Sequence, residues 1–347
     1  MKYSIIVPVY NRPDEVDELL ESLSNQTLTD FEVIIVEDGS VKPCKDVCDK
    51  YADILALHYY AKENSGPGQS RNYGAERANG EWLIILDSDV VLPEGYLAAI
   101  DSSILHQTSD IAAFGGPDAA HPSFTPVQKA ISYSMTSFFT TGGIRGGKAK
   151  LDKFYPRSFN MGIRRDVYHQ LGGFSKMRFG EDIDFSYRIV EAGHQTRLFP
   201  EAWVWHKRRT DFRKFFRQVY NSGIARINLT KRHPGTLKLV HLLPTVFTLG
   251  VIGLILISAV GRALMHYVDR DQFYWMCFAP WIPILLYSLI IFVDSTIRNR
   301  SLWVGLLSIP AAFVQLMGYG LGFIESWWKR CVLKQDEFQA FERTFYK

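Results

Sequence analysis

Asp87 and Asp89 are the residues in this sequence with the clearest chemical potential as a pair. They follow a short apolar stretch and are separated by one serine, so an extended backbone would carry both carboxylates on the same side. Mg²⁺ and Mn²⁺ bind carboxylate oxygens together with phosphate oxygens, so the pair could hold a divalent cation against a diphosphate. Aspartates after an apolar strand are also common turn formers, and this alternative stays open for the triplet taken alone.

Glu181 and Asp182 form a second acidic pair, at the start of a helix predicted over 181–192. A carboxylate can act as a general base that takes the proton from an attacking hydroxyl group. Acidic residues in a first helical turn can also simply complement the helix dipole, which is the alternative here. His206 ends the alternating stretch 203–206 beside a basic cluster. It could contact a metal or a phosphate, although a single histidine is more often structural.

Two further loops contain residues suited to a nucleotide. Asp38, in the segment 37–40, could accept hydrogen bonds from a ribose or a base edge, or could form an Asp-Gly turn. The glycine-rich segment 66–69 precedes a helix, whose N-terminus can bind an anion, and Arg71 is available for a phosphate. A purely structural turn is the alternative for this loop too. Its glycine pattern is neither a P-loop nor a dinucleotide-binding fingerprint.

The elements that must position these loops alternate between strand and helix. The predicted strands are 2–9, 31–36, 56–60 and 82–86, and the predicted helices between them are 15–28, 46–51 and 70–78. This order predicts βαβ units and an α/β fold with an open, mostly parallel sheet that has helices on both faces. Ligands of such sheets bind beyond the carboxyl ends of the strands. The polar residues of this region fall at those ends: Tyr10, Asn11, Glu37, Asp38, Asn64, Asp87 and Asp89.

The middle of the sequence, residues 111–160, is less regular. It is rich in Gly, Ser, Thr and Pro, so we expect mainly loops there, with some strand or helix. Helices are predicted again over 164–171 and 181–192, each ended by glycine, and a strand is predicted over 203–206.

The bulk properties limit the class of protein. The 347 residues exceed one ordinary domain. A formal net charge of +3 is too small to indicate a nucleic-acid partner, so none is expected. The cysteines are Cys44, Cys48, Cys277 and Cys331, too scattered for a disulfide framework or a four-thiolate zinc site, which favours a reducing compartment. The apolar start stops at Pro8, too short for a secretory signal peptide, so the N-terminal domain is expected in the cytoplasm.

Three apolar stretches, 242–260, 275–293 and 302–324, are each near the roughly 20 residues that a helix needs to cross a bilayer. We predict membrane helices there; the alternative is buried helices of a soluble domain. Three spans would place the basic tail outside, against the positive-inside tendency. The third stretch contains Pro310 and several glycines and could be re-entrant or interfacial, so the topology stays open.

Twelve cationic or potentially cationic side chains lie between His206 and Lys238, interleaved with phenylalanines. Such a segment suits the anionic headgroups of a cytoplasmic leaflet, so membrane lipids are expected partners. An ordinary solvated helix face is the alternative.

Taken in order, these segments resemble the large family 2 of inverting glycosyltransferases, whose fold is called GT-A. The matching segments are 4–11, 37–40, 68–74, 87–89 and 180–184, which together extend over about residues 3–210. Their combined order is far more specific than any one of them. The resemblance implies a nucleotide-sugar donor and a divalent metal cofactor, Mn²⁺ or Mg²⁺.

The resemblance also implies a role for each matched residue. Asp182 would be the catalytic base, while Asp89 and His206 would bind the metal. The residues that bind the nucleotide-sugar donor would be Pro8, Tyr10, Asp38, Arg71 and Asp87. The acceptor region would include Asn160, Gly162 and Glu181.

One departure from the family is informative. Its processive synthases carry a Gln-x-x-Arg-Trp signature after the base, whereas here Gln218 is followed three positions later by Asn221 and then Ser222. Transfer of a single sugar is therefore favoured over polymer synthesis.

We expect a hexosyltransferase-type enzyme that moves one sugar to a lipid-linked or glycan acceptor at the membrane surface, by a metal-dependent inverting displacement. Polysaccharide or cell-envelope assembly is the expected setting. One alternative is transfer onto polyprenyl phosphate; another is a non-catalytic sugar-nucleotide-binding subunit of a membrane assembly.

The expected organisation is a catalytic domain at 1–210, a basic amphipathic juxtamembrane segment at 211–240, a transmembrane region at 241–325 and a basic tail at 326–347. The chain would be a multi-pass membrane protein with a cytoplasmic catalytic domain.

Overall fold

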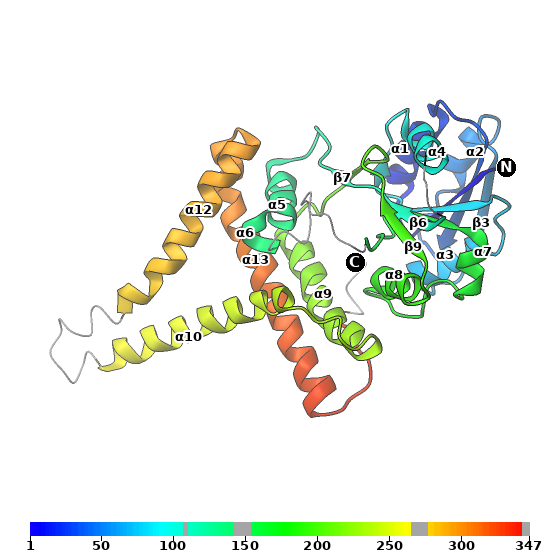
Figure 1. Cartoon of the computed structure of the whole chain (residues 1–347). Helices are drawn as coiled ribbons and strands as arrows, with labels where there is room; N and C mark the ends of the chain where they lie inside the picture. Colours follow the sequence, from blue (N-terminus) through cyan, green and yellow to red (C-terminus); the bar gives the residue numbers. More distant parts are fainter. Residues whose placement is uncertain (107–109, 142–153, 265–276, 342–347) are drawn as a thin grey trace. The chain divides into compact units, whose positions relative to one another are not determined.

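The computed structural model of the chain describes residues 1–106, 110–141, 154–264 and 277–341 (Figure 1). It divides into two compact units. The first, here called the sheet unit, comprises Met1–Pro122 and Lys150–Lys207, and the second, the helical unit, comprises Ser123–Ala149 and Arg208–Lys347. The predicted domain boundary at residue 210 lies close to the change of unit at Lys207. The segment 123–149, predicted within the first domain, instead belongs to the helical unit.

The first part of the sheet unit alternates strands and helices in the predicted order. Pro13 and Pro67 occupy the first turns of two of these helices, where a missing N–H costs no hydrogen bond. The elements are β1 (Tyr3–Val9), α1 (Pro13–Ser24), β2 (Phe31–Asp38), α2 (Lys45–Tyr51), β3 (Leu57–Lys62), α3 (Pro67–Ala75) and β4 (Trp82–Leu86).

The second part of the sheet unit is less regular but contains more secondary structure than the sequence indicated. Its elements are β5 (Val90–Val91), α4 (Tyr96–Leu105), β6 (Ile111–Gly115), β7 (Asp118–Ala119), β8 (Asn160–Arg164), α7 (Arg165–Gln170), α8 (Glu181–Glu191), β9 (Gln195–Leu198) and β10 (Val204–His206). Strands β6 and β7 lie in the region expected to be mainly loops, and β8 begins at its last residue.

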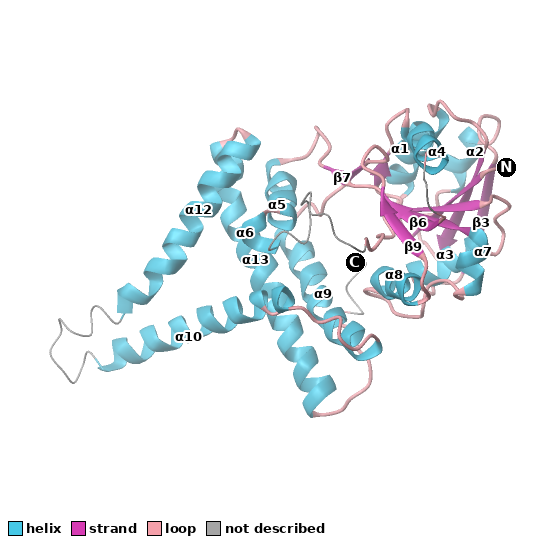
Figure 2. Cartoon of the chain, in the orientation of Figure 1, coloured by secondary structure: helices cyan, strands magenta, loops and turns pink. Residues whose placement is uncertain are grey.

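The larger sheet, within the described residues, has seven strands in the order β3-β2-β1-β4-β8-β6-β9 (Figure 2). Strands β1 to β4 are parallel to one another, and β8 is antiparallel to both of its neighbours, β4 and β6. The prediction of an open, mostly parallel sheet is therefore confirmed. The carboxyl ends of β1, β2, β3 and β4 meet at one edge, where the polar residues of the sequence were expected.

Helices cover both faces of this sheet because side chains alternate between faces along each strand. On one face, Ile5, Val7 and Ile35 pack with α1, α2 and α4. On the other, Ile6 and Ile34 pack with α3, α7 and α8. These strands are buried on both sides and are therefore almost continuously apolar.

A second, three-stranded sheet in the described residues has the order β5-β10-β7. Strand β10 runs antiparallel to β5 and parallel to β7. Its register pairs His206 with Val90, the residue that directly follows Asp89. A hydrogen bond from the Lys207 backbone N–H to the Asp89 carbonyl oxygen, 3.0 Å long, extends this pairing.

The helical unit includes three helices, among the described residues, that are long and apolar enough to cross a membrane: Leu239–Leu264, Ala279–Asn299 and Leu302–Val332. The three predicted apolar helices are thus confirmed, although residues 275 and 276 of the second stretch and 342–347 of the tail lie outside the described residues. The elements of this unit are α5 (Pro126–Thr136), α6 (Phe138–Thr141), α9 (Phe212–Arg232), η1 (Leu239–His241), α10 (Leu243–Leu264), η2 (Ala279–Trp281), α12 (Ile282–Asn299), α13 (Leu302–Trp327) and η3 (Trp328–Val332).

Helix α5 belongs to this unit because its apolar face packs on other helices. Ile131 and Met135 of α5 form a buried cluster with Phe215 and Val219 of α9. Ala130 is buried with Val304 of α13. The composition around α5 is rich in glycine and serine, which is typical of loops. The sequence therefore did not predict this amphipathic helix.

Candidate active site

Asp87, Asp89 and His206 come together in the sheet unit. One ligand atom from each residue, two carboxylate oxygens and an imidazole nitrogen, lies within 4.8 Å of the other two. All three side chains are partly buried. Asp87 and Asp89 follow β4, and the pairing of β10 with β5 brings His206 to them from more than one hundred residues along the chain. The structure therefore brings together Asp89 and His206, which the resemblance assigned to the metal, with Asp87 beside them, in an arrangement that could hold a metal ion.

Further contacts fix this Asp87–Asp89–His206 cluster. His206 Nε2 lies 3.2 Å from Asp89 Oδ1. The imidazole ring stacks on Phe159, with ring centroids 5.0 Å apart. Arg12 donates a hydrogen bond from Nη1 to Asp89 Oδ2 at 2.8 Å. The guanidinium group places a positive charge against a carboxylate that could otherwise repel its neighbour Asp87.

Arg71 connects the cluster to the second acidic pair. It is buried and donates to Asp87 Oδ1 at 2.8 Å and to Glu181 Oε1 at 2.9 Å. Its guanidinium carbon lies 5.2 Å from the centroid of the Phe174 ring. Burial opposes the charge on Arg71, but the two carboxylates outweigh it and raise the pKa of the guanidinium group. Arg71 thus holds Asp87 and Glu181 in a fixed relationship.

Asp182 has a different cationic partner. Both Glu181 and Asp182 are buried, in the first turn of α8. Arg157 donates from Nε to Asp182 Oδ2 at 2.6 Å. Burial alone would raise the pKa of Asp182, but the adjacent Arg157 overcomes this effect and lowers it. Burial instead dominates at Glu181 and raises its pKa to about 7, against the attraction of Arg71.

Two neighbouring carboxyl groups are therefore pushed in opposite directions by their environments. Asp182 is held ionised, whereas Glu181 titrates near neutrality. Such separation of pKa values is typical of sites where one carboxylate must accept a proton.

Asp38 organises the loop between β3 and α3. Its carboxylate accepts hydrogen bonds from the backbone N–H groups of Ser65 and Gly66, each at 2.9 Å, and from the ammonium group of Lys62. Gly66 has φ = 89°, a conformation that favours glycine, and directly precedes α3. Asp38 therefore fixes the glycine-rich loop that leads to Arg71.

Pro8 and Tyr10 lie at the carboxyl end of β1. Pro8 pairs with Val36 of β2, but the ladder from β1 to β4 extends only as far as Ile6. Pro8 therefore occupies a place in a central strand where its missing N–H is tolerated. Tyr10 follows the strand and is partly exposed at this edge.

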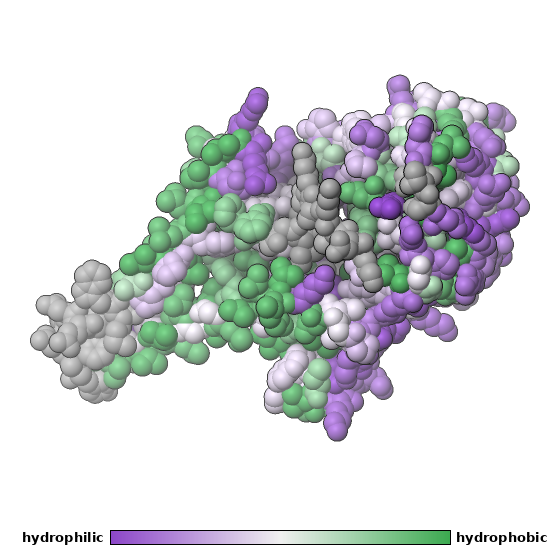
Figure 3. Space-filling view, in the orientation of Figure 1, coloured by the Kyte–Doolittle hydropathy of each residue, from purple (hydrophilic) through white to green (hydrophobic). Residues whose placement is uncertain are grey.

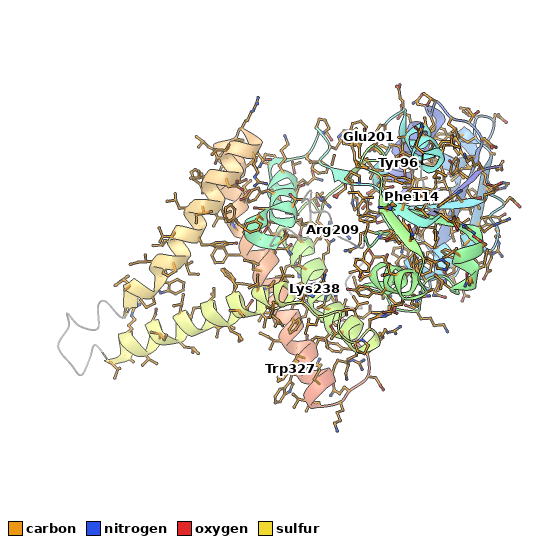
Figure 4. All side chains as sticks on the ribbon, viewed as in Figure 1. Tyr96, Phe114, Glu201, Arg209, Lys238 and Trp327 are labelled. Atoms are coloured by element: carbon orange, nitrogen blue, oxygen red, sulfur yellow. The ribbon has the colours of Figure 1, made fainter. Side chains whose placement is uncertain are left out.

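Asn160 and Gly162 are buried in β8. Asn160 Nδ2 donates to the Ala202 carbonyl oxygen at 2.8 Å, and its Oδ1 accepts from the Tyr96 hydroxyl group at 2.7 Å. A Cβ at Gly162 would lie 2.0 Å from the Phe114 ring, so this strand position requires glycine. Tyr96 and Phe114 are both labelled in Figure 4. Packing and hydrogen bonding therefore explain why asparagine occupies position 160 and glycine position 162. The role of Asn160 and Gly162 in an acceptor region stays a prediction.

Several site residues were missed in the sequence. Arg12 directly follows the Tyr10-Asn11 turn and could have been included by its position at a strand end. Arg157 and Phe159 lie in the region expected to be loops, and only their place just before β8 relates them to the site. Lys62 ends β3 opposite Asp38 in the strand register, which no spacing in the sequence indicates.

Comparison with known proteins relates the chain to glycosyltransferases. Residues 4–172 match the family described as Glycosyl transferase family 2. A pre-mycofactocin glycosyltransferase of Mycobacterium tuberculosis is 27% identical over 252 residues, which are 67% of this chain and 48% of that protein. An uncharacterized glycosyltransferase of Haemophilus influenzae is 31% identical over 195 residues, 54% of this chain and 62% of that protein. The chain thus spans about half the length of the first of these relatives.

A solved structure supports the fold. The mannosyltransferase PcManGT from Pyrobaculum calidifontis, in complex with GDP-Man and Mn²⁺, superposes with a TM-score of 0.57 at 15% sequence identity. The match covers 95% of this chain and 88% of that chain. At this identity the likeness concerns the fold alone. The sheet order, the strand-end carboxylates and the family match over 4–172 together show that this chain carries a domain of glycosyl transferase family 2.

Proposed function

We propose that this chain transfers a single sugar from a nucleotide-sugar donor to a lipid-linked acceptor, by a metal-dependent inverting displacement at a membrane surface. The observation that carries the proposal is the Asp87–Asp89–His206 cluster, whose ligand atoms lie within 4.8 Å of one another at the carboxyl edge of the sheet. Ligands of open α/β sheets bind at that edge. The family match supplies the reaction class.

The residues of the cluster fit a divalent cation. Carboxylate oxygens suit Mn²⁺ and Mg²⁺, and imidazole nitrogen is a ligand that transition metals accept more readily than Mg²⁺ does. Asp89 and His206 would hold the cation, with Asp87 beside it. When bound, the cation would neutralise negative charge on the leaving nucleoside diphosphate.

Asp182 is the proposed general base. The acceptor hydroxyl group attacks the anomeric carbon, its proton passes to the Asp182 carboxylate, and the bond to the nucleoside diphosphate breaks on the opposite side. Because one displacement occurs, the anomeric configuration inverts. Arg157 lowers the pKa of Asp182 and thereby keeps this carboxylate in the ionised form that a base requires.

The donor is proposed to lie along the strand ends from β1 to β4. Pro8 and Tyr10 would line the nucleoside pocket, with Asp38 and the loop that it fixes on another side. Arg71 would act mainly by holding Asp87, since two of its nitrogens already donate to carboxylates. The PcManGT structure contains GDP-Man, a sugar nucleotide, and the donor proposed here belongs to the same class.

The proposed acceptor is lipid-linked because apolar helices follow the sheet unit directly. The sheet unit is proposed to be cytoplasmic, with the basic face of α9 toward anionic headgroups. A glycan without a lipid anchor is the alternative acceptor, and transfer onto polyprenyl phosphate the alternative reaction.

The test is nucleoside diphosphate release by the purified full chain in lipid vesicles, over a panel of sugar nucleotides, with Mn²⁺, Mg²⁺ or chelator. A membrane-lipid extract serves as the acceptor, and a water-soluble sugar serves as its control. Turnover of one donor that needs both the metal and the lipid extract supports the proposal. Donor binding without turnover under any condition would instead support a non-catalytic sugar-nucleotide-binding subunit. Equal turnover with the soluble sugar would overturn the lipid-linked acceptor.

A further inference from the structure

Helices α9 and α13 of the helical unit pack directly on one another. A Cβ added at Gly322 of α13 would lie 2.0 Å from the carbonyl oxygen of Tyr220 of α9. In the reverse direction, a Cβ added at Gly223 would lie 2.2 Å from the carbonyl oxygen of Tyr319. Glycine on both helices therefore allows backbone to touch backbone. The contacts of Val219 with Val314 and of Asn228 with Arg330 show that the two helices run in the same direction.

This contact continues along the second half of α13. It begins where Phe215 and Val219 of α9 cluster with Val314. It ends where Arg330 donates to Asn228 Oδ1 at 3.0 Å. The distance from Val314 to Arg330 along a helix is about 24 Å, which approaches the roughly 30 Å thickness of a hydrocarbon core. If this second half of α13 lay in the hydrocarbon core of a bilayer, α9 would lie there with it.

The composition of α9 excludes such a location. Its 21 residues include six cationic side chains, and the side chain of Lys214 is 58% exposed. Charged side chains at the centre of a bilayer are strongly unfavourable, whereas the same charges are favourable beside anionic headgroups. The cationic residues are Arg213, Lys214, Arg217, Arg226, Lys231 and Arg232.

The three apolar helices also differ in how much of each is covered. In the apolar stretch of each helix, 11% of the residues of α10 and 11% of those of α12 are buried within the protein. The corresponding share for α13 is 44%. The exposed surface of α10 and α12 is mainly hydrophobic in Figure 3. Other helices therefore cover a share of α13 about four times as large as that of α10 or α12, which leaves α10 and α12 with more apolar surface for acyl chains.

The contacts of α13 lie in the first turns of α10 and extend along α12 from Tyr287 to Ser295. A Cβ at Gly320 would meet Pro244 and Thr248, in the first two turns of α10. Ser308 of α13 is hydrogen-bonded to Ser295, 2.6 Å away, near the end of α12. These ends of α10 and α12 are the ones joined to polar segments, at Lys238 and at Arg300. Helix α13 therefore crosses the near end of α10 and packs on the C-terminal part of α12, as far as Tyr287.

The described part of the C-terminal segment returns along α9. Glu337 accepts two hydrogen bonds from Arg232, each 2.7 Å long. The Ala340 backbone N–H donates to Asn221 Oδ1 at 3.0 Å. This segment therefore lies on the same side of a membrane as α9, which begins five residues after β10 ends.

We propose that α10 and α12 form a two-span hairpin in contact with lipid acyl chains, and that α13 lies with α9 at the membrane surface. Two spans return the chain to its starting side, so Lys329 and Arg330 stay on the side of the sheet unit. This removes the conflict between three spans and the positive-inside tendency. The proposal goes beyond the catalytic function and does not depend on it.

Native Cys331 provides the test, because it is exposed at the end of η3, whereas Cys44 and Cys48 are buried. The full chain with Cys277→Ser is expressed in a bacterial inner membrane. Sealed spheroplasts and inverted vesicles are then treated with a membrane-impermeant maleimide. Two matched reporters carry Cys331→Ser together with one new cysteine. Val41→Cys lies in the sheet unit, where Val41 is 86% exposed, and Arg262→Cys lies in the last turn of α10.

Cys331 is expected to be labelled from the same side as Val41→Cys, and Arg262→Cys from the opposite side. Labelling of Cys331 from the side of Arg262→Cys would overturn the proposal, since α13 would then span the membrane. A spin label at Met317→Cys, near the middle of α13, gives a second measurement. It should report a shallower depth than a label at Ile255→Cys in α10, and equal depths would also overturn the proposal.

Discussion

Arg157 donates a hydrogen bond from Nε to Oδ2 of Asp182 at 2.6 Å, and this contact controls the charge of the proposed base. The two residues are 25 positions apart and belong to different elements, the segment before β8 and the start of α8. The neighbouring Glu181 is held by Arg71 instead. Each carboxylate of the pair therefore has its own arginine, and the two can perform different tasks.

Asp182→Asn should remove the base while keeping the shape of the side chain. We expect kcat to fall by at least about 100-fold, the usual effect of losing a general base, with donor affinity changed little. The measurements are nucleoside diphosphate release and donor binding by calorimetry. Asp166→Asn is the control, because Asp166 is an exposed carboxylate that pairs with Arg164. An Asp182→Asn enzyme with full activity would exclude Asp182 from the mechanism.

Arg157→Met should change the pH dependence of activity. Arg157 lowers the pKa of Asp182, so its removal lets burial raise that pKa. The base is active when ionised, and activity is lost as the pH falls through its pKa. The acid limb of the pH profile of kcat/KM should therefore move to higher pH in the variant. Arg164→Met, which removes an arginine paired with Asp110 and Asp166, should leave the limb in place. An unshifted limb in Arg157→Met would show that the ion pair does not set the pKa of the base.

The sequence predicted the framework of the sheet unit well because local patterns determine it. Apolar runs such as Val33–Val36 indicated strands buried on both faces, and the turn residues after them marked the binding edge. The cationic partners were not predictable in the same way. Arg157 approaches Asp182 through a tertiary contact with no fixed spacing, and α5 packs in the helical unit because of its partners rather than its composition.

Asp89→Asn should weaken binding of a divalent cation. The substitution removes one charge from the Asp87–Asp89–His206 cluster and replaces a carboxylate with a poorer ligand. We expect a loss of affinity for Mn²⁺ of about 10-fold or more, measured by calorimetry or electron paramagnetic resonance without any donor. Asp110→Asn, at a carboxylate whose side chain is 85% exposed, should bind Mn²⁺ as the unaltered chain does. Equal affinities in the two variants would remove Asp89 from the metal site.

Arg12→Met should change the same affinity in the opposite direction. Arg12 donates to Asp89 Oδ2 at 2.8 Å, so its positive charge opposes a cation at the cluster. Its loss should tighten Mn²⁺ binding in the same assay, by about 10-fold if the change is near 1.4 kcal/mol. Arg164→Met again serves as the control. Weaker binding in Arg12→Met would mean that Arg12 mainly orients Asp89 rather than competing with the metal.

Gly223→Ala should destabilise the helical unit, whereas Gly250→Ala should not. A Cβ at Gly223 would lie 2.2 Å from the Tyr319 carbonyl oxygen, but a Cβ at Gly250 of α10 would meet no atom within 4 Å. Overpacking of this kind typically costs about 1–3 kcal/mol of unfolding free energy. In a unit of this size, that loss corresponds to a fall of about 2–12 °C in Tm.

The two glycine variants are compared by thermal unfolding in detergent. Each adds the same methyl group to a helix, so helix propensity favours both equally and cannot explain a difference between them. A lower Tm for Gly223→Ala alone would support the direct contact of α9 with α13. The C-terminal segment also lies along α9. If the two variants unfolded at the same temperature, α9 would have room to separate from α13. The helical arrangement on which the two-span hairpin depends would then lose its main support.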